Sequence, residues 1–253
     1  MTDAPTGHPG AHAPDRKRVP GRIAERLPQK PMPHLIQGVL MDLDGTLADT
    51  ARDLVPVLNA LCHEEGQAPI DYDIARNCVS QGARALIRLA FGGGLSDGQE
   101  ERLVARLLEL YAETPCRETV LFDGMTDLLE FLAKNDTPWG VVTNKSGNLA
   151  EAIIETMDFP SPPACLVSGD TLRRRKPHPD PLWEAARRMD VDARHCLYLG
   201  DDPRDMQAAR AAGMTGVIAA FGYIRPETDL ASWEGDATIQ HPAELKAFFN
   251  SAS

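Results

Sequence analysis

Short apolar runs recur along the chain from residue 35 onwards, and segments with helical spacing separate them. The runs are apolar at consecutive positions, which is typical of strands covered on both faces in a parallel sheet. Strands are expected at 35–41, 139–142, 165–167, 196–199 and 216–219. This alternation of strands and helices predicts an α/β fold built on a doubly wound parallel sheet.

Between Asp49 and Glu118 the strand pattern disappears and apolar residues keep helical spacing. This stretch predicts an all-helical cap domain at 51–118. The cap would be inserted into a core formed by residues 34–50 and 119–253.

One proline limits where the first helix of this insert can begin. Pro56 lacks a backbone N–H and is tolerated in the first turn of a helix but not in its interior. The helix is therefore expected to begin near Asp53.

Residues 1–33 differ in composition from the rest of the chain. They contain seven prolines and few large aliphatic residues, so they cannot bury enough apolar surface to offset the entropy of ordering. The stretch has no apolar segment typical of a secretory signal. It is expected to be a disordered leader, partly helical near 21–27.

Composition narrows the classes of partner. The chain has 26 Lys and Arg residues and 37 Asp and Glu residues, which gives a net charge of −11. This negative charge disfavours binding to nucleic acid and to anionic membranes. No apolar run approaches the ~18–20 residues that a membrane span needs. The five cysteines show no CxxC spacing, which argues against a disulfide framework or a zinc site. We expect a cytoplasmic monomer or homodimer that acts on a small molecule.

Polar residues capable of chemistry follow the expected strands directly. In open α/β sheets, ligands bind at the carboxyl ends of the strands. The candidates in chain order are Asp42, Asp44, Gly45, Thr143, Asn144, Lys176, Asp201, Asp202 and Asp205.

Several carboxylates at one site repel each other unless a cation neutralises them. Oxygen ligands without His or Cys favour Mg²⁺. Mg²⁺, a lysine and a hydroxyl suit a phosphoryl group, whose charge must be screened before an anionic nucleophile can approach. Asp42 and Asp44 lie two positions apart, so one can attack phosphorus while the other transfers protons. Gly45 allows a tight turn that exposes backbone N–H groups to phosphate oxygens.

In their order and positions, these residues resemble the four motifs of the haloacid dehalogenase-like phosphatases. The matching segments are Asp42-Leu43-Asp44-Gly45-Thr46, Thr143-Asn144, Lys176-Pro177 and Gly200-Asp201-Asp202-Pro203-Arg204-Asp205. The resemblance covers roughly residues 35–240, and the helical insert resembles the first cap type of that family. It implies a Rossmann-like core and hydrolysis of a phosphate ester.

The resemblance also implies a role for each residue. Asp42 would be the nucleophile that becomes an aspartyl-phosphate. Asp44 would protonate the leaving alcohol and then activate the water that hydrolyses the intermediate. Mg²⁺ would be held by Asp42, the Asp44 backbone carbonyl and Asp201, with support from Asp205 or Asp202. The phosphate would be bound by Gly45, Thr143, Asn144 and Lys176.

The substrate depends on the cap. The chain is similar to bacterial phosphoglycolate phosphatases, and more similar to the N-acetylmuramic acid 6-phosphate phosphatases of cell-wall recycling. The latter resemblance lies in segments 79–85, 200–205 and 221–227, and in Trp233 with 235–237. Both substrates carry a phosphate and a carboxylate, and Arg84 is the candidate partner for the carboxylate. The amino sugar phosphate is the expected substrate, and 2-phosphoglycolate is the alternative.

Other classes of protein contain part of this set of residues. A sugar phosphomutase would use the same residues, and a receiver domain would use a similar strand-end Asp, Thr and Lys but would lack the helical insert. Thr143 could instead cap the helix that contains Leu149, and Asp202 could cap a helix. Lys145 could be structural or could reach the substrate.

Overall fold

The computed structural model describes residues 35–249. The expected leader at 1–33, with its helix near 21–27, lies outside the described residues. Within the described part of the chain, no helix combines the length and the apolar character that a membrane span needs.

Six parallel strands form the central sheet, in the order β5-β4-β1-β6-β7-β8. Their bounds are β1 Gly38–Met41, β4 Trp139–Val142, β5 Cys165–Val167, β6 Cys196–Gly200, β7 Thr215–Ala219 and β8 Ala237–Ile239. The first strand lies inside the sheet with later strands on both sides of it, so the doubly wound parallel topology predicted from the sequence is confirmed. The edge strand β8 was not predicted.

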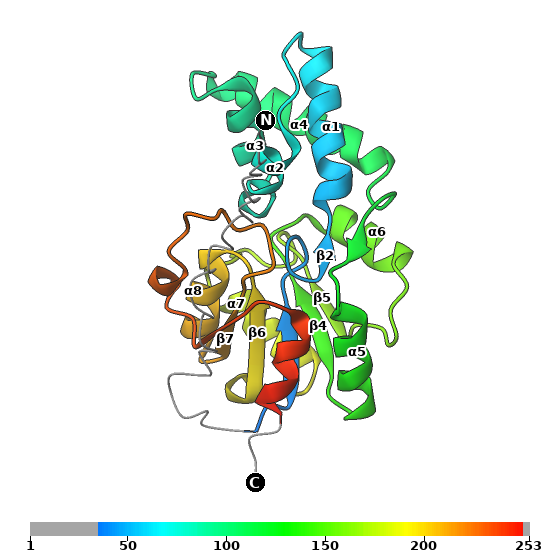
Figure 1. Ribbon diagram of the computed structural model, residues 1–253, viewed down its shortest axis with the longest axis vertical. Helices are drawn as coiled ribbons and strands as arrows, with labels where there is room; N and C mark the ends of the chain where they lie inside the picture. The colour runs from blue at the N-terminus through cyan, green and yellow to red at the C-terminus, as the bar shows by residue number, and fades with distance from the viewer. Residues whose placement is uncertain (1–34, 250–253) are drawn as a thin grey trace, which may run out of the picture.

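Helices cover both faces of this sheet, which explains the continuous apolar runs (Figure 1). In β1, Val39 and Met41 share one apolar cluster with α5 (Met125–Lys134), α6 (Gly147–Thr156) and η4 (Pro242–Phe248). Leu40 points to the opposite face and joins a cluster with α7 (Asp180–Arg188) and α8 (Pro203–Ala212). Because successive side chains of a strand alternate between faces, both parities must be apolar.

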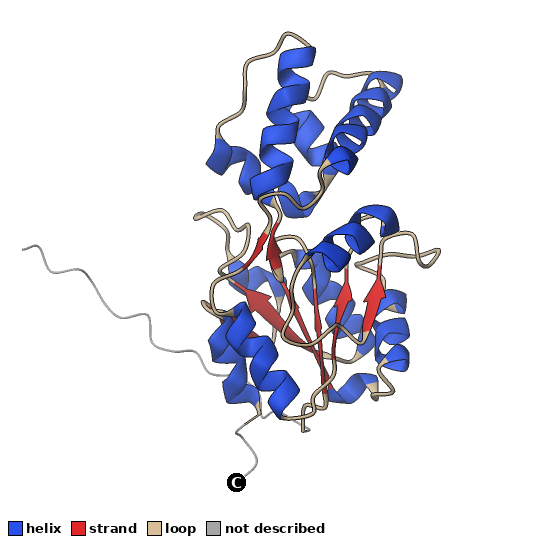
Figure 2. Cartoon of the chain, turned by 90° about the vertical axis from the view of Figure 1, so that its right-hand side faces the viewer, coloured by secondary structure: helices blue, strands red, loops and turns tan. Residues whose placement is uncertain are grey.

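Four α-helices follow β1 and form a separate unit beyond the carboxyl ends of the strands (Figure 2). They are α1 Ala51–Glu64, α2 Tyr72–Arg76, α3 Ala83–Phe91 and α4 Asp97–Glu113, with the short η1 Val79–Gln81 between α2 and α3. Their apolar faces share one cluster that includes the buried Leu58, Leu86 and Leu107. We call this unit the helical insert.

An antiparallel pair of two-residue strands, β2 (Ala48–Asp49) and β3 (Val120–Leu121), joins the helical insert to the sheet. Two further short helices, η2 (Ala193–His195) and η3 (Leu230–Trp233), lie in connections of the core.

Helix α1 begins at Ala51, so the expected start near Asp53 was two residues late and Pro56 lies in the second turn. Pro56 cannot donate to the Arg52 carbonyl, and one intrahelical hydrogen bond is lost. A residue distant in sequence stabilises the start of α1 at Ala51: the Ala51 N–H donates to the Tyr223 hydroxyl at 2.8 Å. Local sequence does not reveal such a contact.

Candidate active site

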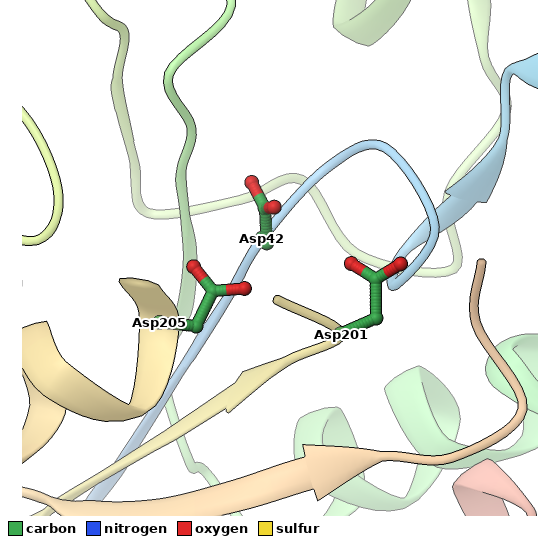
Figure 3. Close-up of side chains that lie close together, drawn as sticks. All are labelled: Asp42, Asp201 and Asp205. Atoms are coloured by element: carbon green, nitrogen blue, oxygen red, sulfur yellow. The ribbon is translucent and has the colours of Figure 1, made fainter. Parts of the chain in front are cut away.

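Three carboxylates converge at the carboxyl end of the sheet (Figure 3). Asp42 follows β1, Asp201 follows β6, and Asp205 lies in the first turn of α8. Each offers a ligand atom within 4.8 Å of the other two, and all three residues are buried. An all-oxygen donor set of this kind fits Mg²⁺.

The positive charge near this acidic cluster is too small to neutralise its carboxylates. Burial and the neighbouring charges of Asp42 and Asp205 raise the pKa of Asp201 well above its ordinary value. Burial also raises the pKa of Asp205, although Lys176 opposes that rise. A divalent cation would remove the electrostatic penalty that both shifts reflect.

Lys176 is the buried cation of the cluster. Its Nζ lies 2.9 Å from Asp42 Oδ1 and 2.8 Å from Asp205 Oδ1. It also donates to the Val142 carbonyl at 3.0 Å and to the Tyr198 hydroxyl at 2.8 Å. Burial alone would lower the pKa of Lys176, but Asp205 and Asp42 raise it above its usual value. Lys176 therefore stays charged between the two carboxylates.

Asp44 is held by two donors outside the acidic cluster. Its Oδ1 accepts a hydrogen bond from Thr50 Oγ1 and lies 2.8 Å from Lys145 Nζ. Lys145 is nearly inaccessible to solvent, and its Nζ lies 4.7 Å from the centre of the Tyr111 ring in α4. The sequence left the role of Lys145 open; the structure places it against Asp44, beneath the helical insert.

Gly45 occupies a position that no other residue fits. Its φ is +82°, and a Cβ atom there would lie 2.1 Å from Asp201 Oδ2. The glycine lets the Asp42–Asp44 turn approach the carboxylate of the fourth motif.

Thr143 and Asn144 directly follow β4. The Thr143 hydroxyl accepts from the Lys145 N–H at 3.2 Å, and the N-cap of α6 is Ser146, so the alternative role of Thr143 as the cap of this helix is wrong. Asn144 Nδ2 donates to the Lys176 carbonyl at 3.0 Å. Asn144 Oδ1 is buried and has no hydrogen-bond partner among the described residues, which leaves an acceptor at the site.

Asp202 and Asp205, which the sequence left as alternatives for supporting the metal, have different contacts in the structure. Asp202 is the N-cap of α8: its carboxylate accepts from the Arg204 N–H at 2.9 Å and pairs with the Arg204 guanidinium at 2.7 Å. Asp205, three residues later, belongs to the acidic cluster and pairs with Lys176 through Oδ1, while its Oδ2 accepts the Asp202 N–H at 3.1 Å.

Replacing Asp202 by Ala should therefore affect stability and not the metal. Loss of a helix N-cap typically costs about 1 kcal/mol of unfolding free energy. We expect urea denaturation of Asp202→Ala to show a loss of that order, while the Kd for Mg²⁺ measured by calorimetry stays the same. A marked weakening of Mg²⁺ binding would assign Asp202 to the metal site.

Three further residues contact Asp201 and were not identified from the sequence. Ser80 Oγ donates to Asp201 Oδ2 at 2.7 Å, and the Tyr223 N–H donates to the same oxygen at 2.9 Å. Thr46 Oγ1 donates to Asp201 Oδ1 at 3.2 Å. Ser80 and Tyr223 lie in segments 79–85 and 221–227. The resemblance of these segments to other phosphatases was used only to predict the substrate, and not a contact with Asp201.

A cavity of about 280 Å³ opens beside Asp201, between the helical insert and the core. We call it the Trp233 cavity. Its lining includes Ser80, Gln81, Asp202, Pro203, Arg225 and Trp233.

Arg84 lies outside the Trp233 cavity. It lines an adjoining groove of about 630 Å³ together with Arg88, Arg204 and Arg225. Its Nη1 lies 2.6 Å from Glu100 Oε1, so its guanidinium is already paired in this structure.

Comparisons with known proteins agree with this geometry. Residues 39–219 match the family model described as haloacid dehalogenase-like hydrolase. A phosphoglycolate phosphatase of Xanthomonas campestris pv. campestris is 42% identical over 209 residues, which cover 83% of this chain and 94% of the relative. An N-acetylmuramic acid 6-phosphate phosphatase of Pseudomonas aeruginosa is 37% identical over 210 residues, covering 83% and 93%.

The fold is also found among solved structures. The crystal structure of a predicted phosphoglycolate phosphatase from Haemophilus somnus superposes with a TM-score of 0.74 at 21% identity, covering 84% of this chain and 97% of the other. The family match and the phosphatase relatives support hydrolysis of a phosphoric monoester. The chain belongs to the haloacid dehalogenase-like hydrolases.

Proposed function

We propose that this enzyme is a Mg²⁺-dependent phosphomonoesterase that forms an aspartyl-phosphate and acts on N-acetylmuramic acid 6-phosphate. The observation that carries the chemistry is the buried group of Asp42, Asp201 and Asp205, two of which, Asp42 and Asp205, pair with Lys176. The phosphoglycolate phosphatases among the relatives favour 2-phosphoglycolate as the second candidate.

Asp42 is the nucleophile of this reaction. A carboxylate oxygen of Asp42 attacks phosphorus, and the bond between phosphorus and the ester oxygen breaks as Asp44 gives a proton to the leaving alcohol. Asp44 then takes a proton from water, which attacks the aspartyl-phosphate and releases inorganic phosphate. Lys145 and Thr50 hold the Asp44 carboxylate in place for both proton transfers.

The residues that would hold Mg²⁺ are Asp42, the Asp44 carbonyl and Asp201, with Asp205 as support. When bound, the ion supplies positive charge that screens the phosphate from the nucleophile. Lys176 places a second positive charge beside Asp42. Thr143 and Asn144 follow the neighbouring strand β4 and would contact the phosphate.

The Trp233 cavity supports an amino sugar as substrate. It brings together segments 79–85, 200–205 and 221–227 with Trp233, on which the resemblance to N-acetylmuramic acid 6-phosphate phosphatases depends. An indole ring and amide side chains suit a sugar ring with an N-acetyl group. A two-carbon ester such as 2-phosphoglycolate has no group to fill this space.

Arg225 is the candidate partner for the lactyl carboxylate of the sugar. It lines the cavity, and its Nη2 contacts Cys78 Sγ at 3.1 Å. Across residues 35–249, no carboxylate forms an ion pair with it, so the guanidinium is available for a charge-assisted hydrogen bond. This differs from Arg84, which is paired with Glu100.

The test is phosphate release with Mg²⁺ from N-acetylmuramic acid 6-phosphate, 2-phosphoglycolate and N-acetylglucosamine 6-phosphate. We expect kcat/KM for the first to exceed that for 2-phosphoglycolate by about 100-fold, or ~2.7 kcal/mol of transition-state discrimination. The reverse order would make 2-phosphoglycolate the substrate.

A pair of arginine variants tests the carboxylate contact. Arg225→Gln should lower kcat/KM for N-acetylmuramic acid 6-phosphate by about tenfold or more, as for a lost charge-assisted hydrogen bond. It should leave N-acetylglucosamine 6-phosphate unaffected, because that ester lacks the lactyl group. Arg84→Gln is the matched control and should change neither. An equal loss on both sugars in Arg225→Gln would contradict this contact.

A further inference from the structure

One side chain of the helical insert reaches into the acidic cluster. Ser80 lies in η1, and its Oγ is 2.7 Å from Asp201 Oδ2 and 3.4 Å from the Asp44 carbonyl oxygen. Both of these groups are assigned to Mg²⁺ by the proposed function. A hydroxyl from the insert therefore lies against two of the oxygens that would surround the ion.

The Ser80 hydroxyl lies next to two acceptors. A serine hydroxyl has one proton to donate and two lone pairs that can accept. Both of its contacts, the Asp44 carbonyl and the Asp201 carboxylate, are acceptors. Only one of them can receive the proton at a time, whereas a cation would be attracted by all three oxygens together.

The position of Ser80 is fixed by a second contact with the core. The Arg204 guanidinium donates to the Ser80 carbonyl at 2.7 Å while it pairs with Asp202 at 2.7 Å. Arg204 lies in the first turn of α8, three residues after Asp201. Ser80 is therefore held to the core through its backbone by Arg204 and through its side chain by Asp201.

We propose that Ser80 Oγ is a ligand of the Mg²⁺ ion, so that the helical insert contributes directly to the metal site. With the ion bound, the hydroxyl would no longer donate to Asp201 and would offer an oxygen lone pair to Mg²⁺. Binding of Mg²⁺ would then strengthen the contact between the helical insert and the core, and that contact would strengthen Mg²⁺ binding in return. This inference rests on the magnesium site of the proposed function and adds a ligand from outside the core.

The experiment is calorimetric titration of the substrate-free protein with MgCl₂. Ser80→Ala should raise the Kd for Mg²⁺ by about tenfold, the effect typical of a group that supports a metal site. Ser96→Ala is the matched control, because it removes a serine hydroxyl elsewhere in the same insert, at the N-cap of α4. Its Kd should stay at the wild-type value.

Asp201→Asn distinguishes failure of this inference from failure of the proposed function. If Asp201→Asn loses Mg²⁺ binding and Ser80→Ala binds as tightly as wild type or more tightly, Ser80 is not a ligand and only this inference is overturned. If Asp201→Asn binds Mg²⁺ like wild type, the metal site itself is misplaced and both are overturned.

Discussion

Asp42→Asn is expected to lower kcat by at least about 10⁴-fold, the scale of losing the nucleophile of a covalent mechanism. Asp42 Oδ1 accepts the Leu43 N–H at 2.8 Å and lies 2.9 Å from Lys176 Nζ. These contacts hold the carboxylate through Oδ1, so Oδ2 is the oxygen that would attack phosphorus in the proposed mechanism. An amide at this position is a poor nucleophile and cannot form the acyl phosphate.

Rapid quenching with a labelled phosphate ester measures this directly. Wild type should show a burst of acid-stable phosphoprotein that decays with turnover, and Asp42→Asn should show none. Asp44→Asn should form the phosphoprotein slowly and also hydrolyse it slowly, each by about 10²–10⁴-fold, because it loses general acid–base catalysis in both steps. Phosphorylated Asp42→Asn protein would show that another residue is the nucleophile.

The strands of the sheet interior could be predicted from the sequence because their burial on both faces leaves a continuous apolar run. Both edge strands have three residues, but β5 has two buried side chains and was predicted, whereas β8 (Ala237–Ile239) has only one and was not. The β2–β3 pair is too short to show any periodicity. These elements depend on pairing with distant segments, which local sequence does not encode.

The strand-end positions of Asp42 and Asp201 could also be predicted, because parallel strands bring their carboxyl ends to one edge. Lys176 lies in the connection between β5 and α7, and its place beside them was expected from the family motif. Ser80 and Lys145 could not be placed in this way. Ser80 reaches Asp201 across 121 positions of sequence, and Lys145 reaches Asp44 across 101. The pairing of Arg84 with Glu100 likewise depends on how α3 packs against α4.

Lys176→Met should cause the second large effect, on both activity and stability. The methionine keeps the length of the chain but leaves Asp42 and Asp205 buried without their cation. Breaking a buried ion pair by removing one partner typically costs 3–5 kcal/mol, so we expect a loss of about 4 kcal/mol in unfolding free energy near neutral pH. The turnover rate should fall by about 10³-fold, because the phosphate also loses its charged partner.

The loss of stability should depend on pH. Burial raises the pKa of Asp205 to about 7, while Lys176 lowers it, so removing the lysine moves the pKa higher still. Because the folded state holds a proton that the unfolded carboxyl releases near pH 4, the contribution of Asp205 to stability falls as the pH rises from about 4 to its folded pKa. In wild type this fall ends near pH 7, whereas in Lys176→Met it continues to the higher folded pKa. The destabilisation by Lys176→Met should therefore be smaller at pH 5, where Asp205 is protonated, than at pH 8.

Urea denaturation in EDTA at pH 5 and pH 8 measures this difference without a contribution from bound metal. Lys134→Met is the matched control: Lys134 forms an exposed pair with Glu130 at 3.2 Å, and such pairs contribute less than about 1 kcal/mol. Equal losses in the two variants, or a loss in Lys176→Met that does not change with pH, would show that Lys176 does not neutralise the acidic cluster. If Lys176→Met instead loses more unfolding free energy at pH 8 than at pH 5, and excess Mg²⁺ restores part of that loss, the result would show that Lys176 and Mg²⁺ neutralise the same buried carboxylates.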